Sequence, residues 1–195
     1  MDQPPPDTKN WTWVLEQQCP ECGYEAYAAE RNELGARIRA NAADWRRLLS
    51  RGDLVYQRPP VAPGQPPAWS ALEYGAHTRD VVQLFHDRLK LALSKKNPTF
   101  SDWDQDRAAI DGNYAEQDPN QVAYQLAATA GRVADMVDRV NGSQWERTAK
   151  RSDGAEFTVE TLIRYKLHDL VHHVWDVEQG YEALTATDEG EGGEE

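Results

Sequence analysis

The sequence contains few residues that could cross-link the chain or anchor it in a membrane. Among 195 residues there are two cysteines, two methionines and five histidines. Two cysteines cannot form a disulfide framework. No run of about 18 apolar residues occurs, so we expect no membrane-spanning segment. Residues 1–10 lack the basic and apolar regions of a secretory signal, and the sequence therefore predicts a cytoplasmic protein.

The chain also has fewer basic residues than acidic ones. The chain has 33 acidic residues against 21 Lys and Arg, which gives a net charge of −12. This charge disfavours nucleic acid and anionic membranes as partners, because both repel an acidic surface. Five of the acidic residues lie in the last eight positions, so we expect residues 183–195 to form a disordered acidic tail. Residues 1–10, with three consecutive prolines, are expected to be mobile, which leaves residues 11–182 as a single domain.

Helical periodicity accounts for most of this domain. Apolar residues at spacings of three, four and seven predict helices over about 26–49, 71–96, 119–140 and 158–181. Ser70 followed by Glu73 has the spacing of a capping box, and Asp118-Pro119 has the form of a helix start. The proline-rich run 58–67 predicts an extended connection, and a turn at 151–154 predicts a small hairpin. The sequence therefore predicts an all-α fold, a four-helix bundle with connections that are not all short.

Three of the five histidines are candidate metal ligands. His168 and His172 are four residues apart, so on a helix they share one face and could bind the same ion. His173 lies about 140° away from His168 around the helix axis and is set aside. Of the two histidines expected on the second helix, His77 has small neighbours that allow close approach, whereas His86 has charged ones. The alternative is that His168 and His172 are surface or core-edge residues that bind no metal.

Several charged residues are candidates for supporting roles near these histidines. Glu73, Asp80 and Asp176 are spaced to accept hydrogen bonds from imidazole nitrogens, although each could equally be a solvated helix charge. Arg79 and Arg164 are candidate cationic groups for holding an anionic substrate.

Two segments and their spacing carry a resemblance to a known family. The segments are WSALEYGAHTRDVVQLFHDRL (69–89) and RSDGAEFTVETLIRYKLHDLVHHVWDVE (151–178), with 91 residues from His77 to His168. They resemble the DinB-like superfamily, which includes the mycothiol-dependent maleylpyruvate isomerases. The resemblance extends from about residue 11 to residue 181.

The resemblance implies a four-helix bundle of the DinB-like type with a long crossover. It implies a divalent metal, zinc or nickel, held by His77, His168 and His172. It also implies a low-molecular-weight thiol such as mycothiol or bacillithiol, a small electrophile as the other substrate, and a homodimer. In the maleylpyruvate isomerase branch one metal ligand is typically a carboxylate. By motif, this sequence has His168 at that position.

The cysteines form a separate motif, Cys19-Pro-Glu-Cys22-Gly23, within an extension (11–25) that we expect to pack on the bundle. The motif has the form of a zinc knuckle, but a structural zinc usually needs a second pair of ligands. Three interpretations remain open. The pair forms a turn with reduced thiols, completes a metal site with groups from elsewhere, or is redox-active.

The sequence thus favours a metal-dependent enzyme that uses a low-molecular-weight thiol, an S-transferase or isomerase, in which the metal activates thiol or water. A metal-dependent hydrolase and a non-catalytic metal-binding module are the alternatives.

Overall fold

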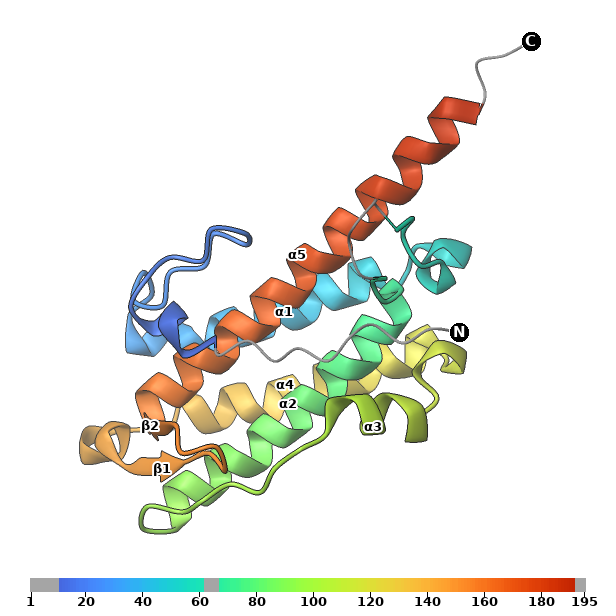
Figure 1. The fold of residues 1–195 in the computed structure, drawn as a ribbon. Coiled ribbons are helices and arrows are strands. Elements are labelled where there is room, and N and C mark those ends of the chain that lie inside the picture. The colour runs from blue at the N-terminus through green and yellow to red at the C-terminus, as the bar shows by residue number, and fades with distance from the viewer. Residues whose placement is uncertain (1–10, 62–66, 192–195) are drawn as a thin grey trace.

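A computed structural model describes residues 11–61 and 67–191, the last five as backbone only. Its four long helices are α1 (Leu34–Leu48), α2 (Ala71–Ser94), α4 (Pro119–Val137) and α5 (Val159–Glu191). Both α1 and α2 pack against α4 and against α5, so α1 and α2 occupy opposite corners of the bundle (Figure 1). The predicted all-α four-helix bundle is confirmed.

The connection between α1 and α2 is the long crossover. It contains a short 3₁₀ helix, η3 (Gly52–Tyr56), and carries the chain from one corner of the bundle to the opposite one. Residues 57–61 and 67–70 of this connection form no helix, as the prolines of 58–67 predict, and residues 62–66 lie outside the described part. None of the helices in the described residues is long and apolar enough to cross a membrane.

The helix starts follow the predicted caps. The backbone N–H of Glu73 donates to Ser70 Oγ (3.2 Å), and the Glu73 carboxylate accepts from Ser70 N (2.8 Å), so the capping box of α2 is confirmed. The Asp118 carboxylate accepts from the backbone N–H of Gln121 (2.7 Å) at the start of α4, with Pro119 as the first helical residue. The predicted hairpin is also present, as β1 (Thr148–Lys150) antiparallel to β2 (Glu156–Thr158).

The structure departs from the predicted helices mainly in three places. α1 starts at Leu34, because residues 26–33 form turns and the short 3₁₀ helix η2 (Arg31–Glu33). A seven-residue helix, α3 (Gln105–Asp111), is present in addition to the four predicted helices, and Asp104 caps it. α5 continues ten residues past its predicted end, so the structure describes 183–191 of the expected acidic tail as helix. The expected mobile residues 1–10 and the last four residues lie outside the described part.

The N-terminal extension lies along α5. Its 3₁₀ helix η1 (Trp11–Leu15) packs against α5, and Tyr24 donates a hydrogen bond to the carbonyl of Arg164 (2.8 Å). The Arg164 guanidinium in turn donates to the carbonyls of Ala26 (2.6 Å) and Ala29 (2.9 Å). Arg164 is only 3% exposed. Its side chain therefore holds the extension in place, and the buried guanidinium does not have the substrate-binding role that we predicted for it.

Candidate metal centres

Two faces of α5 carry two different groups of polar side chains. His168 and His172 lie against Trp11 of the N-terminal extension, whereas His173, with Asp169 beside it, contacts His77 of α2. Both pairs are spaced by four residues, so both make use of the same helical geometry. The rotation of α5 therefore decides which pair faces which partner.

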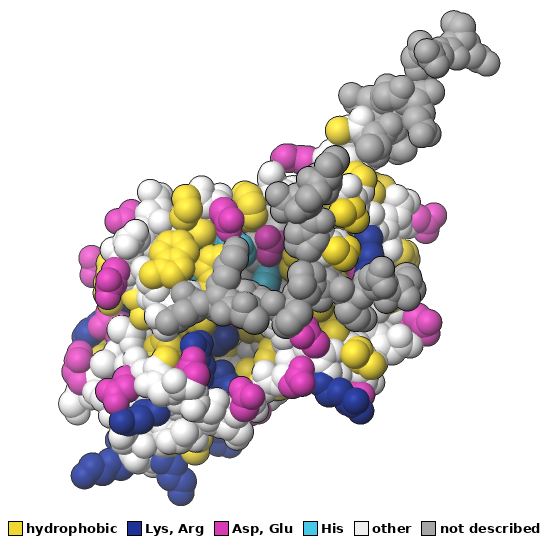
Figure 2. Space-filling view, viewed as in Figure 1, with side chains coloured by type: hydrophobic (Ala, Val, Ile, Leu, Met, Phe, Trp, Pro, Cys, Tyr) yellow, Lys and Arg dark blue, Asp and Glu magenta, His cyan; other side chains and the backbone are white. Residues whose placement is uncertain are grey.

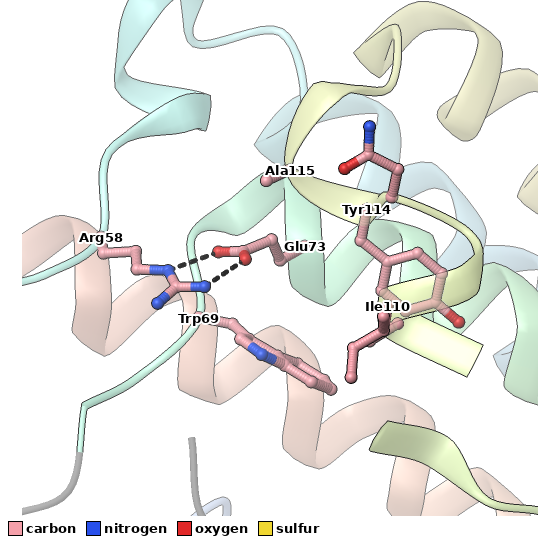
Figure 3. Close-up of a pocket in the computed structure, with 8 residues that line it drawn as sticks. Arg58, Trp69, Glu73, Ile110, Tyr114 and Ala115 are labelled. Atoms are coloured by element: carbon pink, nitrogen blue, oxygen red, sulfur yellow. Dashed lines mark hydrogen bonds and ion pairs between the residues drawn. The ribbon is translucent and has the colours of Figure 1, made fainter. Parts of the chain in front are cut away.

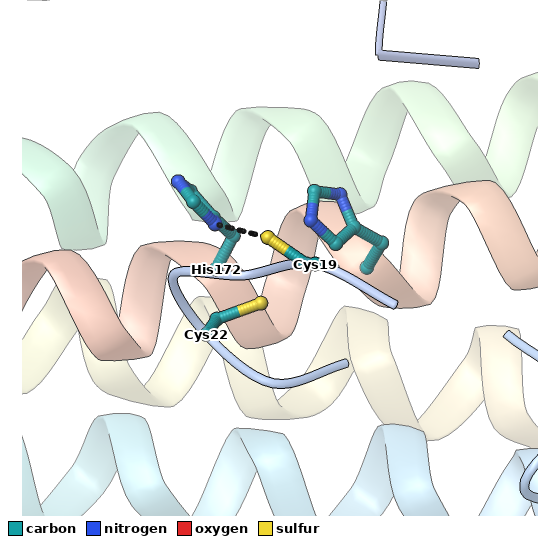
Figure 4. A group of neighbouring side chains, drawn as sticks. Cys19, Cys22 and His172 are labelled. Atoms are coloured by element: carbon teal, nitrogen blue, oxygen red, sulfur yellow. Dashed lines mark hydrogen bonds between the residues drawn. The ribbon is translucent and has the colours of Figure 1, made fainter. Parts of the chain in front are cut away.

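The first group combines two cysteines and two histidines. Cys19, Cys22, His168 and His172 each offer a donor atom, and these four atoms all lie within 4.8 Å of one another. Cys19 Sγ is 3.8 Å from His172 Nδ1, a contact marked by the dashed line in Figure 4. The two histidine rings have centroids 5.2 Å apart. The described residues thus contain a group that could hold a metal ion. We refer to it as the Cys₂His₂ group.

The environment of the Cys₂His₂ group is largely dry. Cys19, His168 and His172 are buried, and the indole of Trp11 lies against both histidine rings at centroid distances of 5.5 and 5.0 Å. Burial and the neighbouring His172 lower the pKa of His168 to about 4, so its ring is neutral. Burial raises the pKa of the Cys22 thiol to about 12. A cation among these donors would be required to ionise such a thiol.

The second group surrounds His77 on α2. The His77 ring is 3% exposed and contacts His173 edge to face, with centroids 5.0 Å apart. It also stacks on Trp103 (5.6 Å) and lies against Trp69 (5.1 Å). Its Nδ1 atom is buried with no hydrogen-bond partner in the described chain, and burial together with His173 lowers its pKa to about 3. His77 therefore presents a neutral imidazole.

Two carboxylates of α5 hold the ring of His173. Asp176 lies 3.1 Å from Nδ1, and Asp169 lies 3.5 Å from Nε2. Burial opposes protonation of His173, but the hydrogen bond to Asp176 and the charge of Asp169 outweigh it and raise the pKa. Asp169 also pairs with the ammonium of Lys166 (3.0 Å). Burial disfavours the charged form of Asp169, yet Lys166 and His173 lower its pKa overall.

The three predicted ligands are therefore divided between the two groups. His168 and His172 lie together with the cysteines, while His77 lies beside His173 and is not part of the Cys₂His₂ group. Sequence reasoning set His173 aside and did not consider Asp169. The overlapping i, i+4 pair Asp169–His173 was the available signal, but the sequence does not give the rotation of α5.

Of the three candidate acids, Asp176 contacts imidazole nitrogens as predicted, whereas Glu73 and Asp80 pair with other groups. Asp176 approaches His172 (3.7 Å) as well as His173, so it lies between the two groups. Asp80 accepts from the Tyr114 hydroxyl (2.6 Å) and pairs with Arg79 (2.8 Å). Glu73 is bound by Arg58, as described below. His86 belongs to neither group. It contacts the carboxylate of Asp87, one of the charged neighbours for which we had set it aside.

A cavity of about 220 Å³ lies beside the second group (Figure 3). Trp69 lines it and also contacts His77, so the cavity and the buried histidine share one wall. Arg58 and Glu73 form a bidentate ion pair in this wall, with N–O distances of 2.9 and 2.5 Å. Tyr114 and the exposed Ile110 line the opposite side. The cavity thus offers both apolar and charged surface to a small molecule.

Figure 2 shows the surface of the molecule from the same side as Figure 1. Histidine side chains are visible on it, with hydrophobic and acidic side chains around them, and Lys and Arg side chains gather mainly toward one end. The visible histidines therefore lie where the surface is mixed apolar and acidic.

Comparison with known proteins gives a family and a fold. The family model described as the DinB superfamily matches residues 48–177. No curated protein matches the chain. YfiT from Bacillus subtilis, described as "a probable metal-dependent hydrolase with an unusual four-helix bundle topology", has a similar structure, with a TM-score of 0.72 and 15% identity. The match covers 83% of this chain and 94% of that one.

Proposed function

The chain belongs to the DinB superfamily, and on that premise we propose that it is a metal-dependent enzyme that uses a low-molecular-weight thiol. We propose that His77, Asp169 and His173 hold the metal. The observation that carries this proposal is the buried His77 ring, which presents a neutral imidazole to His173 beside a cavity.

The donor atoms of His77, Asp169 and His173 suit a divalent ion. Two imidazoles and one carboxylate form a ligand set that zinc and nickel accept. His77 Nδ1 is buried without a partner in the described residues, which is costly unless some group binds it. Three protein ligands leave a coordination position open, as catalytic sites require.

This ligand set shifts the α5 pair by one residue from the predicted His168 and His172. The shift places Asp169 where the motif alignment had placed His168. A carboxylate at this position is what the resemblance to the maleylpyruvate isomerase branch leads one to expect. His77 therefore keeps its predicted role as a ligand, with Asp169 and His173 as its partners on α5.

The chain's own residues orient these ligands. His173 Nδ1 donates to Asp176, which fixes the tautomer and leaves the Nε2 lone pair available. Lys166 pairs with Asp169 and holds its carboxylate in place. Trp69 and Trp103 cover His77 and exclude water from it. A bound metal would lower the pKa of a thiol or water at its open position.

The cavity next to His77 is the proposed binding place for the electrophile. Its Arg58–Glu73 pair and the Trp69 ring offer contacts to a small molecule with both polar and apolar parts. The thiol partner is of the mycothiol or bacillithiol type, and the metal is zinc or nickel. We further propose a cytoplasmic protein that forms a homodimer.

An assay of thiol transfer tests the proposal. Purified protein loaded with zinc or nickel is supplied with mycothiol, bacillithiol or glutathione and a chromogenic electrophile. We expect turnover by the wild type, loss of at least about 100-fold in His77→Ala, and full activity in the control His86→Ala. Equal activity of wild type and His77→Ala would rule out the assigned metal ligand.

Hydrolysis is the second candidate function, because the structurally similar YfiT is described as a probable metal-dependent hydrolase. Cleavage of esters or amides that does not depend on added thiol, and that is lost in His77→Ala, favours it. Metal binding without turnover of any thiol, ester or amide favours a non-catalytic metal-binding module.

A further inference from the structure

The Cys₂His₂ group brings together donors from two distant parts of the chain. Cys19 and Cys22 come from the N-terminal extension, and His168 and His172 come from α5, about 150 residues later. Both cysteines are free, so no disulfide accounts for their proximity. The proximity of the four donor atoms, which all lie within 4.8 Å of one another, therefore needs another explanation.

The spacing of the donors suits one tetrahedral ion. With zinc bonds of about 2.3 Å to sulfur and about 2.0 Å to nitrogen, neighbouring ligand atoms lie roughly 3.3–3.8 Å apart. Cys19 Sγ and His172 Nδ1 are 3.8 Å apart, and no pair in the group exceeds 4.8 Å. Movements of about 1 Å or less would therefore close the four donors around an ion.

The ring nitrogens are arranged as metal ligands usually are. His168 Nε2 is buried and has no hydrogen-bond partner among the described residues, so its lone pair is available. His172 directs Nδ1 toward Cys19, while its Nε2 lies 3.4 Å from the carboxylate of Glu21 and 3.7 Å from that of Asp176. A carboxylate on the second nitrogen is the usual device that orients a ligating histidine.

The loop that carries the cysteines is also shaped for a metal. The Gly23 N–H donates to the Cys19 carbonyl (2.9 Å), and the Cys19 N–H donates to the Tyr24 carbonyl (2.8 Å), which closes a tight turn. Gly23 has φ +70°, a left-handed conformation that favours glycine. The turn holds the two thiols on the same side, facing α5 (Figure 4).

We propose that Cys19, Cys22, His168 and His172 form a second, structural zinc site, separate from the site around His77. Two sulfur and two nitrogen donors select zinc among the common divalent ions, and four protein ligands leave no open position for substrate. The ion joins the extension to α5 across the sequence. Its function is to stabilise the fold and to keep the extension docked beside the histidines.

Zinc content and the identity of the ligand atoms test this site directly. The His77→Ala variant removes a ligand of the other site, so the zinc that it retains reports on the Cys₂His₂ group alone. We expect about one equivalent of zinc per chain in His77→Ala, with X-ray absorption showing two sulfur and two nitrogen neighbours. Adding Cys19→Ser and Cys22→Ser should abolish this zinc. Absence of zinc from His77→Ala, or zinc without sulfur neighbours, overturns the proposal.

A measurement on a protein with both cysteines covers the case in which the serine variants do not fold. Zinc is removed from folded His77→Ala by a chelator and then restored, and alkylation of the two thiols and the Tm are measured in each state. We expect slow alkylation with zinc, rapid alkylation without it, and a Tm that falls by about 5–10 °C on chelation and recovers on re-addition. Thiols and Tm that do not respond to zinc overturn the proposal.

Discussion

The imidazole ring of His77 on α2 meets the ring of His173 on α5 edge to face, with centroids 5.0 Å apart. His172, one residue earlier, points to the other side of α5, where it lies 3.8 Å from the thiol of Cys19. His172 and His173, although adjacent on one helix, thus belong to two different groups. Asp176 lies against both of them and connects the two groups.

The first prediction concerns the carboxylate of the proposed catalytic site. Asp169→Asn keeps the shape of the side chain but removes the charge, so we expect metal affinity at the His77 site to fall by roughly 10–100-fold. Competition with a chromogenic chelator measures this affinity. The Asp153→Asn variant changes an exposed aspartate that is held by Arg151 and should bind metal as the wild type does. Equal affinity in Asp169→Asn would exclude Asp169 as a ligand.

The second prediction concerns acid stability. Glu73 has only 5% of its side chain exposed, and although burial opposes its ionisation, Arg58 and the backbone of Ser70 lower its pKa overall. Its contribution to stability is therefore present above the unfolded value of about 4.3 and is lost as the pH falls through the folded pKa. Glu73→Gln, which can still form the capping box, should lower the free energy of unfolding by about 1–3 kcal/mol at pH 7.

Denaturant titrations at pH 7 and at about pH 3.5 measure this effect. The difference between wild type and Glu73→Gln should shrink at the lower pH, because the wild-type carboxylate then begins to bind a proton. The control Glu116→Gln makes the same change at an exposed residue and should match the wild type at both values. A difference that grows on acidification contradicts the prediction.

The third prediction concerns the attachment of the extension. Arg164→Met removes the donor from the carbonyls of Ala26 and Ala29, and it leaves Arg31 as the arginine that still binds the Glu160 carboxylate. We expect a loss of about 2–4 kcal/mol in the free energy of unfolding, and faster proteolysis within residues 16–33. Arg107→Met, at an exposed ion pair, serves as the control and should leave both measurements unchanged. An extension equally resistant to protease in Arg164→Met would show that other contacts hold it.

The fourth prediction concerns the cavity. Ile110 is 57% exposed at its edge, so a larger side chain should be tolerated by the fold but should obstruct entry. We expect Ile110→Trp to raise the KM for the electrophile by roughly tenfold with little change in kcat, because it affects binding and not the metal ligands. Tyr124→Trp, at an exposed residue of α4, is the matched control. Unchanged KM in Ile110→Trp would place the electrophile elsewhere.

The bundle could be predicted because its signals are local. Ser70 with Glu73 and Asp118 with Pro119 fix the starts of α2 and α4 through contacts within one turn of helix. The start of α1 could not be predicted in the same way. Residues 26–33 have apolar spacing suited to a helix, but the carbonyls of Ala26 and Ala29 instead accept from the buried Arg164, a contact far along the sequence.

The same distinction between local signals and long-range contacts applies to the metal ligands. Spacing alone shows that His168 and His172 share a face, and they do lie together. It shows equally that Asp169 and His173 share the adjacent face. Which face meets His77 depends on the rotation of α5 within the bundle, and that rotation follows from the packing of all four helices and of the extension. The role of Cys19 and Cys22 likewise depends on where the extension docks.

Anomalous diffraction at the zinc edge, from crystals of the zinc-loaded wild-type protein, distinguishes two metal sites on each chain from one. We expect two separate peaks for each chain. One should lie among Cys19, Cys22, His168 and His172, and the other should lie between His77 and His173 with Asp169 as a neighbour. A single peak bound jointly by His77, His168 and His172 would contradict the division of the histidines between two sites.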